Sequence, residues 1–246
     1  MSELPSQPAP VERRVILALE EAGAPGFLFE LAASLARGQG RGLVAKVREN
    51  PDLHAAAALP FVQQVDSHSA ATREWTLAQV QQARLRTERQ WQQRLKELSL
   101  AHTLRAHLEW VRGSRLDVLR GGLASQDLLV LGSGRDGNHG GALRIAAVCL
   151  SHAVDTEVLA AAESLGEALR AGIQLLQAEQ REPGPSGSPH AGRAIQVGNS
   201  LGSVISAAAA ARAHILVLPR RLCGPDAPSV VQAFLARPGR CIVVMP

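Results

Sequence analysis

Aromatic residues are scarce in this chain of 246 residues. They make up 3% of it, and tyrosine is absent. The hydrophobic fraction is still 46%, an ordinary value for a globular protein. The core must therefore be aliphatic and rich in alanine. Such a core favours parallel strands covered by helices and argues against an aromatic-rich β-sandwich.

Lysine is rare as well, since Lys46 and Lys96 are the only two. The net charge of +4 and the isoelectric point of about 9.6 would fit a nucleic-acid partner if the basic residues were clustered. The arginines are instead interspersed with Glu and Asp. We therefore expect no nucleic-acid partner, and we interpret the segment ARLRTERQWQQRLKE as one solvated helix face.

Cysteine is limited to three residues with no CxxC pair. Cys149 and Cys241 lie in apolar runs, where a thiol packs as a small hydrophobe. This usage is typical of a reducing cytoplasm. No apolar run is long enough for a membrane span, and the segment MSELPSQPAPVERR has no apolar stretch of the signal-peptide kind. We expect a cytoplasmic protein without membrane insertion, in which residues 1–12 form a disordered tail.

What the sequence does contain is an internal repeat with an offset of 130 residues. Arg14 and Gly42 match Arg144 and Gly172 at this offset without a gap. Each copy reads as an apolar run, an Ala/Leu-rich helix, a glycine and a second apolar run. This order is typical of a right-handed βαβ crossover in a parallel sheet. The expected elements are Val15–Leu19, Phe27–Arg37 and Leu43–Val47, and again Ile145–Leu150, Glu157–Arg170 and Ile173–Leu176.

The two copies differ in their middle parts. The first contains a long polar helix, predicted from about Thr72 to Ser99, whose apolar residues keep helical spacing: Leu77, Val80, Ala83, Thr87, Trp91, Leu95 and Leu98. The second has the linker REPGPSGSPHAGR in its place. We therefore expect a first unit over 13–143 and a degenerate second unit over 144–246, packed as one pseudo-dimer. The final run RCIVVMP predicts a fifth strand in the second unit.

The order of these elements, with RRVILALEEAG first, VRGSRLDVLRGGLASQDLLVLGSG in the second half and RCIVVMP last, resembles the universal stress protein family in its tandem form. The resemblance covers about residues 13–137 and 144–246. It implies an α/β fold of two Rossmann-like units of the adenine-nucleotide-alpha-hydrolase type. It also implies dimerisation through the fifth strand, within the chain or between chains.

Family members that bind ATP have an acidic residue after the first strand and a loop of the form G-x2-G-x9-G-[ST] after the fourth. Such glycines let backbone N–H groups surround phosphate oxygens. Gly134 and Gly137 satisfy G-x2-G here, but the G-[ST] half is missing. In the second copy Leu150 replaces the acid, and Pro219-Arg220-Arg221 replaces the glycines. The resemblance thus implies one degraded ATP site in the first unit, formed by Glu20, Val47, Gly113, Gly132, Gly134, Gly137 and Gly140.

Other motifs favour structural roles. Ser200 stands in a G-x-S-x-G pattern after an apolar run, as in the nucleophile elbow of a serine hydrolase. Downstream of it, His214 precedes Asp226, which is the wrong order for that triad. We expect a helix cap at Asn199 or Ser200. The eight histidines show no metal-ligand spacing, and the tryptophans are expected in the core or in an interface.

These observations favour a stress-response regulator that docks to a protein partner and is not an enzyme. Two alternatives stay open. The first is an ATP or AMP sensor with weak ATPase activity in the first unit, which would make ATP the cofactor. The second is a serine hydrolase at Ser200.

Overall fold

The computed structural model describes residues 13–20, 26–49, 51–65, 69–112, 123–133, 142–150, 152–178 and 195–246. Nine strands form one sheet in the order β5-β2-β1-β6-β11-β10-β7-β8-β9, and β3 and β4 form a separate hairpin. The α/β fold predicted from the sequence is confirmed. The predicted tail 1–12, the predicted linker at 181–193, and Gly113, Gly134, Gly137 and Gly140 lie outside the described residues.

The sheet has two halves that run in opposite directions. All neighbouring strands are parallel except β6 and β11, which are antiparallel. The first half comprises β1 (Arg14–Glu20), β2 (Gly42–Glu49), β5 (Ala106–Arg112) and β6 (Leu128–Gly132). The second half comprises β7 (Arg144–Cys149), β8 (Gly172–Ala178), β9 (Ile195–Val197), β10 (Ile215–Pro219) and β11 (Cys241–Met245). The carboxyl ends of the two halves therefore lie at opposite edges of the sheet.

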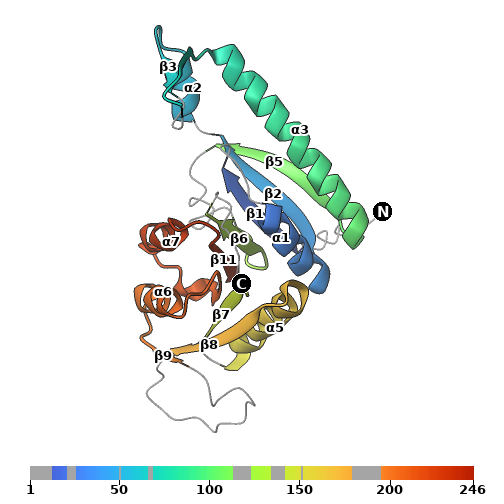
Figure 1. Ribbon diagram of the computed structural model, residues 1–246. Helices are drawn as coiled ribbons and strands as arrows, with labels where there is room; N and C mark the ends of the chain where they lie inside the picture. The colour runs from blue at the N-terminus through green and yellow to red at the C-terminus, as the bar shows by residue number, and fades with distance from the viewer. Residues whose placement is uncertain are drawn as a thin grey trace, which may run out of the picture.

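Helices cover both faces of the sheet (Figure 1). One face packs against α1 (Gly26–Gly38), α3 (Leu77–His102) and α5 (His152–Leu169). The other packs against α6 (Leu201–Ala210) and α7 (Ala227–Leu235). Successive side chains of a strand point to opposite faces, so Val15 and Leu17 join the first cluster and Ile16 the second. Both faces of the central strands are buried, which explains their unbroken apolar runs.

Residues 130 positions apart occupy matching places. Val15 pairs with Leu43 in β1–β2, and Ile145 pairs with Ile173 in β7–β8. The turns before β2 and β8 also correspond, with left-handed residues at Gly40 (φ 59°) and Arg170 (φ 50°). At Gly40 the glycine adopts this conformation without steric cost, whereas Arg170 adopts it despite its side chain.

The long helix begins later than the sequence predicted. Thr72–Glu74 form β4, which pairs with β3 (Gln63–Val65), and α3 starts after Thr76. Thr76 caps the helix: its Oγ1 accepts from Gln79 N at 3.3 Å, and Gln79 Oε1 accepts from Thr76 N at 3.1 Å. This reciprocal cap sets the start of the helix at Leu77, which is also the first of the apolar residues with helical spacing. The burial of Trp91 is confirmed, at 7% exposure.

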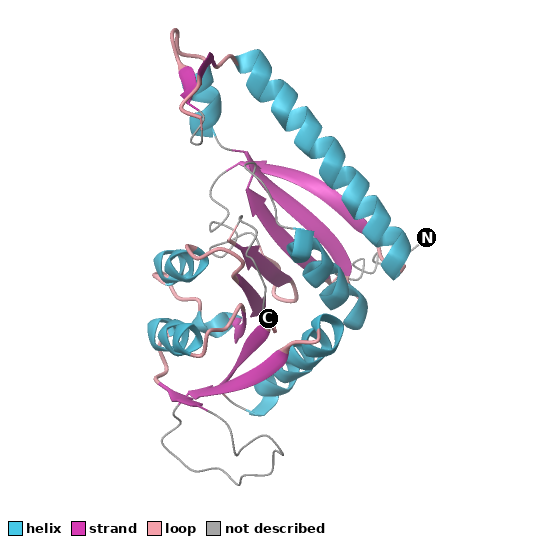
Figure 2. Ribbon diagram, viewed as in Figure 1, coloured by secondary structure: helices cyan, strands magenta, loops and turns pink. Residues whose placement is uncertain are grey.

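A small module projects beyond the carboxyl end of β2. It consists of α2 (Pro51–Ala57) and the β3–β4 hairpin, and it leads into the first turn of α3 (Figure 2). This module is part of the first half only. The helices within the described ranges include none that combines the length and the apolar composition of a membrane span.

The predicted fifth strand is confirmed as β11, and it lies inside the sheet. It pairs in parallel with β10 and in antiparallel fashion with β6. The expectation of a homodimer through this strand needs correction, because β11 has a neighbour on each side and offers no open edge to a second chain. Pairing through the fifth strand takes place within the chain.

Candidate functional site

Three of the predicted site residues come together at the carboxyl edge of the first half. Leu19 pairs with Val47, which places Glu20 of β1 next to the end of β2. Ala18 pairs with Leu131, so Gly132 of β6 reaches the same edge on the other side. Carboxyl ends of parallel strands are where open α/β sheets bind ligands. Here a ligand would meet Glu20 and the backbone at Val47 and Gly132.

The side chain of Val47 is unavailable to a ligand at this edge. It is fully buried in the cluster beneath α1 and α3. Glu20 is half-buried and lies opposite Arg48 in the β1–β2 register. The edge thus presents one acid beside one base, and Val47 contributes backbone alone.

Gly132 is fixed by packing. A Cβ at this position would lie 2.1 Å from Leu28 Cδ1 and 2.7 Å from Leu28 Cδ2. The first turn of α1 therefore needs a glycine here in order to approach β6. The sequence assigned this glycine to phosphate binding, while the structure gives it a packing role.

The residue after β6 is tied to the start of β11. Ser133 N donates to Arg240 O at 2.9 Å, and Gly239 N donates to Ser133 Oγ at 3.0 Å. The Arg240 guanidinium lies 4.6 Å from the centre of the Phe234 ring. Burial lowers the pKa of Arg240, and the nearby Arg237 lowers it further. The segment that enters the predicted phosphate loop is thus held by the second half.

A corresponding contact lies at the carboxyl edge of the second half. Arg220, directly after β10, donates from Nη1 to Ala124 O at 2.9 Å and from Nη2 to Leu123 O at 3.1 Å. Both carbonyls belong to the segment before β6. Leu150 stands where the first half has Glu20. This second edge therefore contacts the first half instead of presenting an acid and glycines.

A charged cluster that sequence reasoning missed lies at the ends of β2 and β5. Glu49 forms an ion pair with Arg84, and its carboxylate also lies 3.9 Å from His54 Nε2 and 3.9 Å from Arg112 Nε. The Arg84 guanidinium lies 4.3 Å from the centre of the Trp110 ring. The interpretation of this helix segment as one solvated face is wrong for Arg84, whose side chain is 29% exposed. The sequence contained one signal of this cluster, the tryptophan Trp110 in the strand β5. That α3 packs beside β5 cannot be read from the sequence.

Ser200 serves as a helix cap, as predicted. Its Oγ accepts from Ser203 N at 3.1 Å and lies 2.7 Å from Ser203 Oγ. Ser200 follows the carboxyl end of β9, whereas His214 precedes the amino end of β10. Since β9 and β10 run in the same direction, the two side chains lie at opposite edges of the sheet. His214 Nδ1 accepts from Arg144 N at 3.2 Å. This separation argues against a Ser–His pair.

In the part of the chain that the structure describes, no group of three His, Cys, Asp or Glu side chains could hold a metal ion.

Comparison with known proteins gives remote structural likenesses. No protein-family model matches the chain, and no curated protein matches it. A functionally unknown protein from Pseudomonas aeruginosa PAO1 is similar at 10% identity and a TM-score of 0.47, over 96% of this chain and 92% of that one. A universal stress protein from Archaeoglobus fulgidus DSM 4304 is similar at 8% identity and a TM-score of 0.44, over 94% and 95%.

A third likeness is to the cytoplasmic domain of a prokaryotic cation chloride cotransporter, at 10% identity and a TM-score of 0.41, over 95% of each chain. Likenesses at this level assign neither a ligand nor a partner to this chain.

Proposed function

We propose that the chain is a tandem protein of the universal stress type, with one unit over 13–143 and a second, degenerate unit over 144–246. The equal register of β1–β2 and β7–β8 at an offset of 130 residues supports a duplication. The strand order also supports it, because β5-β2-β1-β6 on one side of β11 mirrors β9-β8-β7-β10 on the other. The second unit has the linker region where the first has the projecting module and α3.

The function that fits this architecture best is that of a cytoplasmic, non-enzymatic regulator of a stress response that acts by docking to a protein partner. One observation carries the proposal: each carboxyl edge is used to hold the two halves together. Ser133 is bound to Gly239 and Arg240 at one edge, and Arg220 is bound to Leu123 and Ala124 at the other. Ser133 and Arg220 follow β6 and β10, where a phosphate-binding loop would begin, and their hydrogen bonds join the two halves.

A nucleotide titration tests this proposal. We expect no rise in the melting temperature with about 1 mM ATP and an equal concentration of magnesium, and no hydrolysis above a buffer blank. A site held at a hundred times its dissociation constant would add about 2.7 kcal/mol of stability. A shift of that size, or nucleotide that co-purifies with the folded protein, would contradict the proposal.

The alternative of a nucleotide sensor is favoured by the meeting of Glu20 with the β2 and β6 ends at one edge. It predicts saturable ATP or AMP binding in equilibrium dialysis. It also predicts that Glu20→Gln weakens this binding about tenfold, since a hydrogen bond to a charged group contributes about 1.5–3 kcal/mol. The matched control is Glu97→Gln, at an exposed site on α3. Equal affinity of both variants and the parent chain would reject the sensor.

A partner surface is offered by the projecting module. Its Leu59, Phe61 and Val65 side chains are 61%, 96% and 62% exposed. A gathering of large exposed apolar side chains is a common mark of a protein interface. We expect a photo-crosslinking residue at position 61 to yield a discrete protein adduct in cells.

The matched control is position 100. Leu100 is 75% exposed and lies about 35 Å from the start of α3. Equal adducts from both positions would show nonspecific contact and would remove the module from the proposal.

A further inference from the structure

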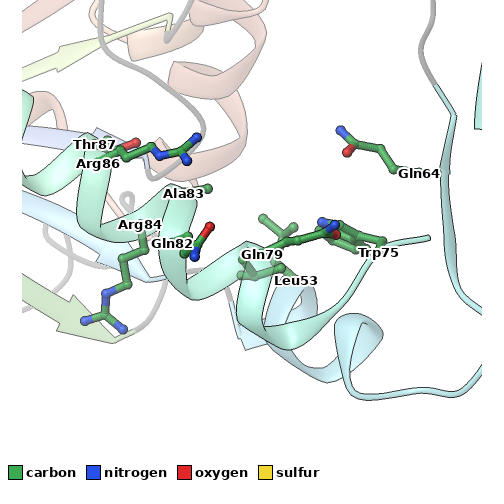
Figure 3. A pocket seen from close by; sticks show the side chains of 10 residues that line it. Leu53, Gln64, Trp75, Gln79, Gln82, Ala83, Arg84, Arg86 and Thr87 are labelled. Atoms are coloured by element: carbon green, nitrogen blue, oxygen red, sulfur yellow. The ribbon is translucent and has the colours of Figure 1, made fainter. Parts of the chain in front are cut away.

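A pocket of about 380 Å³ lies between the projecting module and the first turns of α3 (Figure 3). Gln64 of β3 faces α3 across the opening, and Leu53, Gln79 and Trp75 lie on the other side (Figure 3). The volume falls within the range of about 300–1,000 Å³ that is usual for small-molecule sites. Glu20, Val47 and Gly132, the predicted nucleotide-binding residues that the structure describes, do not line this pocket.

The aromatic wall of the pocket is held in place by its backbone. Trp75 N donates to Val62 O at 3.1 Å, which fixes the strand that carries the indole. The next residue, Thr76, forms the reciprocal cap with Gln79 described above. A wall fixed before a ligand arrives lowers the entropic cost of binding.

The lining of the pocket is cationic. Of the ten described residues that line it none carries a carboxylate, and two are arginines. Arg84 is neutralised by Glu49 and points away from Gln64 and Trp75 (Figure 3). Arg86 is exposed and has no carboxylate partner among the residues that the structure describes. One positive charge is therefore available to a ligand.

We propose that this pocket binds a small planar monoanion. Its ring system would pack against Trp75 and Leu53, because an indole and an aliphatic side chain form a favourable apolar wall. Its polar edge would hydrogen-bond with amide groups such as that of Gln82, which supplies both donors and an acceptor. Its single negative group would pair with Arg86 in a charge-assisted hydrogen bond. This site is separate from the nucleotide edge. It adjoins the module proposed above as a partner surface, but ligand binding here does not rest on that proposal.

The test uses the full chain and 8-anilinonaphthalene-1-sulfonate, a fluorescent monoanion with a planar naphthalene ring. We expect saturable one-to-one binding that is about tenfold weaker in Arg86→Gln, as expected for loss of one charge-assisted hydrogen bond. Trp75→Leu should weaken binding about fivefold, and Trp75→Phe should restore most of it. N-phenyl-1-naphthylamine has the same rings without the sulfonate, so its binding should be weaker and indifferent to Arg86→Gln.

Two matched variants locate the site. Arg89→Gln removes the same charge one turn further along α3, outside the pocket, and should leave binding within twofold of the parent chain. Glu20→Gln should also leave it unchanged, which separates this pocket from the nucleotide edge. Circular dichroism confirms that each variant is folded. Equal weakening by Arg86→Gln and Arg89→Gln, or binding that is indifferent to Trp75→Leu, would overturn the proposal.

Discussion

Gly132 and Leu28 bring the end of β6 and the first turn of α1 into direct contact. The geometry admits no side chain at position 132, because a Cβ would overlap both methyl groups of Leu28. Leu28 lies in a closely packed aliphatic core, which leaves its side chain few alternative rotamers. This residue pair therefore sets how closely helix and sheet approach next to the candidate edge.

Gly132→Ala should lower the free energy of unfolding by about 1–3 kcal/mol, the usual cost of overpacking a core. The midpoint of a urea titration measures it. The double variant Gly132→Ala with Leu28→Ala should recover part of the loss that the two single variants predict together. Gly172→Ala is the control, because a Cβ there meets nothing within 4 Å. Equal midpoints for Gly132→Ala and the parent chain would contradict this account.

The cysteines differ in their surroundings. Cys241 is fully buried in β11, and Cys223 is partly buried after the turn that carries Arg220. Burial raises the pKa of the Cys223 thiol to about 11, although the charge of Arg220 opposes the shift. Burial also raises the pKa of Cys241. Both residues thus act as hydrophobic side chains at neutral pH.

Alkylation by iodoacetamide should follow from these pKa values. The thiolate is the reactive form, so a raised pKa lowers its fraction at any pH below that value. In a Cys149→Ser chain we expect slow labelling of Cys223 at pH 8, rising about tenfold per pH unit until about pH 11. Cys241 should label only in urea. Mass spectrometry of digested samples measures both, and a plateau for Cys223 by pH 9 would contradict the assignment.

At the scale of the element, α3 owes its start to a cap and its position to a few buried residues. The helix is polar over most of its surface, and Val80, Trp91, Leu95 and Leu98 are buried. Its first two turns carry the pocket residues Gln79 and Gln82. The cap at Thr76 is therefore important both for the helix and for the shape of the pocket.

Thr76→Ala should cost about 1 kcal/mol, as for other N-caps. The loss should be local, so amide hydrogen exchange should speed up in the first turn of α3 more than near Leu95. Gln81→Ala, at an exposed site on the same helix, is the control and should change stability by less than about 0.5 kcal/mol. Uniform faster exchange along the whole helix would show that the cap is not what fixes its start.

At the scale of the whole molecule, β11 makes one sheet of two halves. It pairs with β10 of its own half and with β6 of the other half. The hydrogen bonds of Ser133 and Arg220 that join the halves lie beside these strands. Its five residues are all buried. Neither half can lose its fold without exposing the strand edges and apolar faces of the other.

The chain should accordingly unfold as one cooperative unit. Trp75, Trp91 and Trp110 all lie in the first half, so intrinsic fluorescence reports on that half, whereas far-UV circular dichroism reports on both. We expect the two urea transitions to coincide. A Phe234→Trp reporter in α7 serves as the control for the second half. A separate, earlier transition for that reporter would show that the halves unfold independently.

Sequence reasoning located the elements that depend on local pattern. The runs at Val15–Leu19 and Leu43–Val47 became β1 and β2 with one or two residues added at their ends, because apolar periodicity and glycine turns are local signals. It missed the Glu49–Arg84 pair and the pocket beside Trp75. Both depend on which strand and hairpin lie next to α3, and no local pattern encodes that.

The sequence by itself predicted an aliphatic α/β core, a βαβ pattern that recurs at an offset of 130 residues, and an apolar final strand, since each follows from composition and spacing. Only the tertiary structure decided that β11 lies between the two halves and that Ser133 and Arg220 close the sheet edges. It also decided that Gly132 accommodates Leu28. Contacts between residues about a hundred positions apart depend on how the chain returns on itself, and packing alone sets that path.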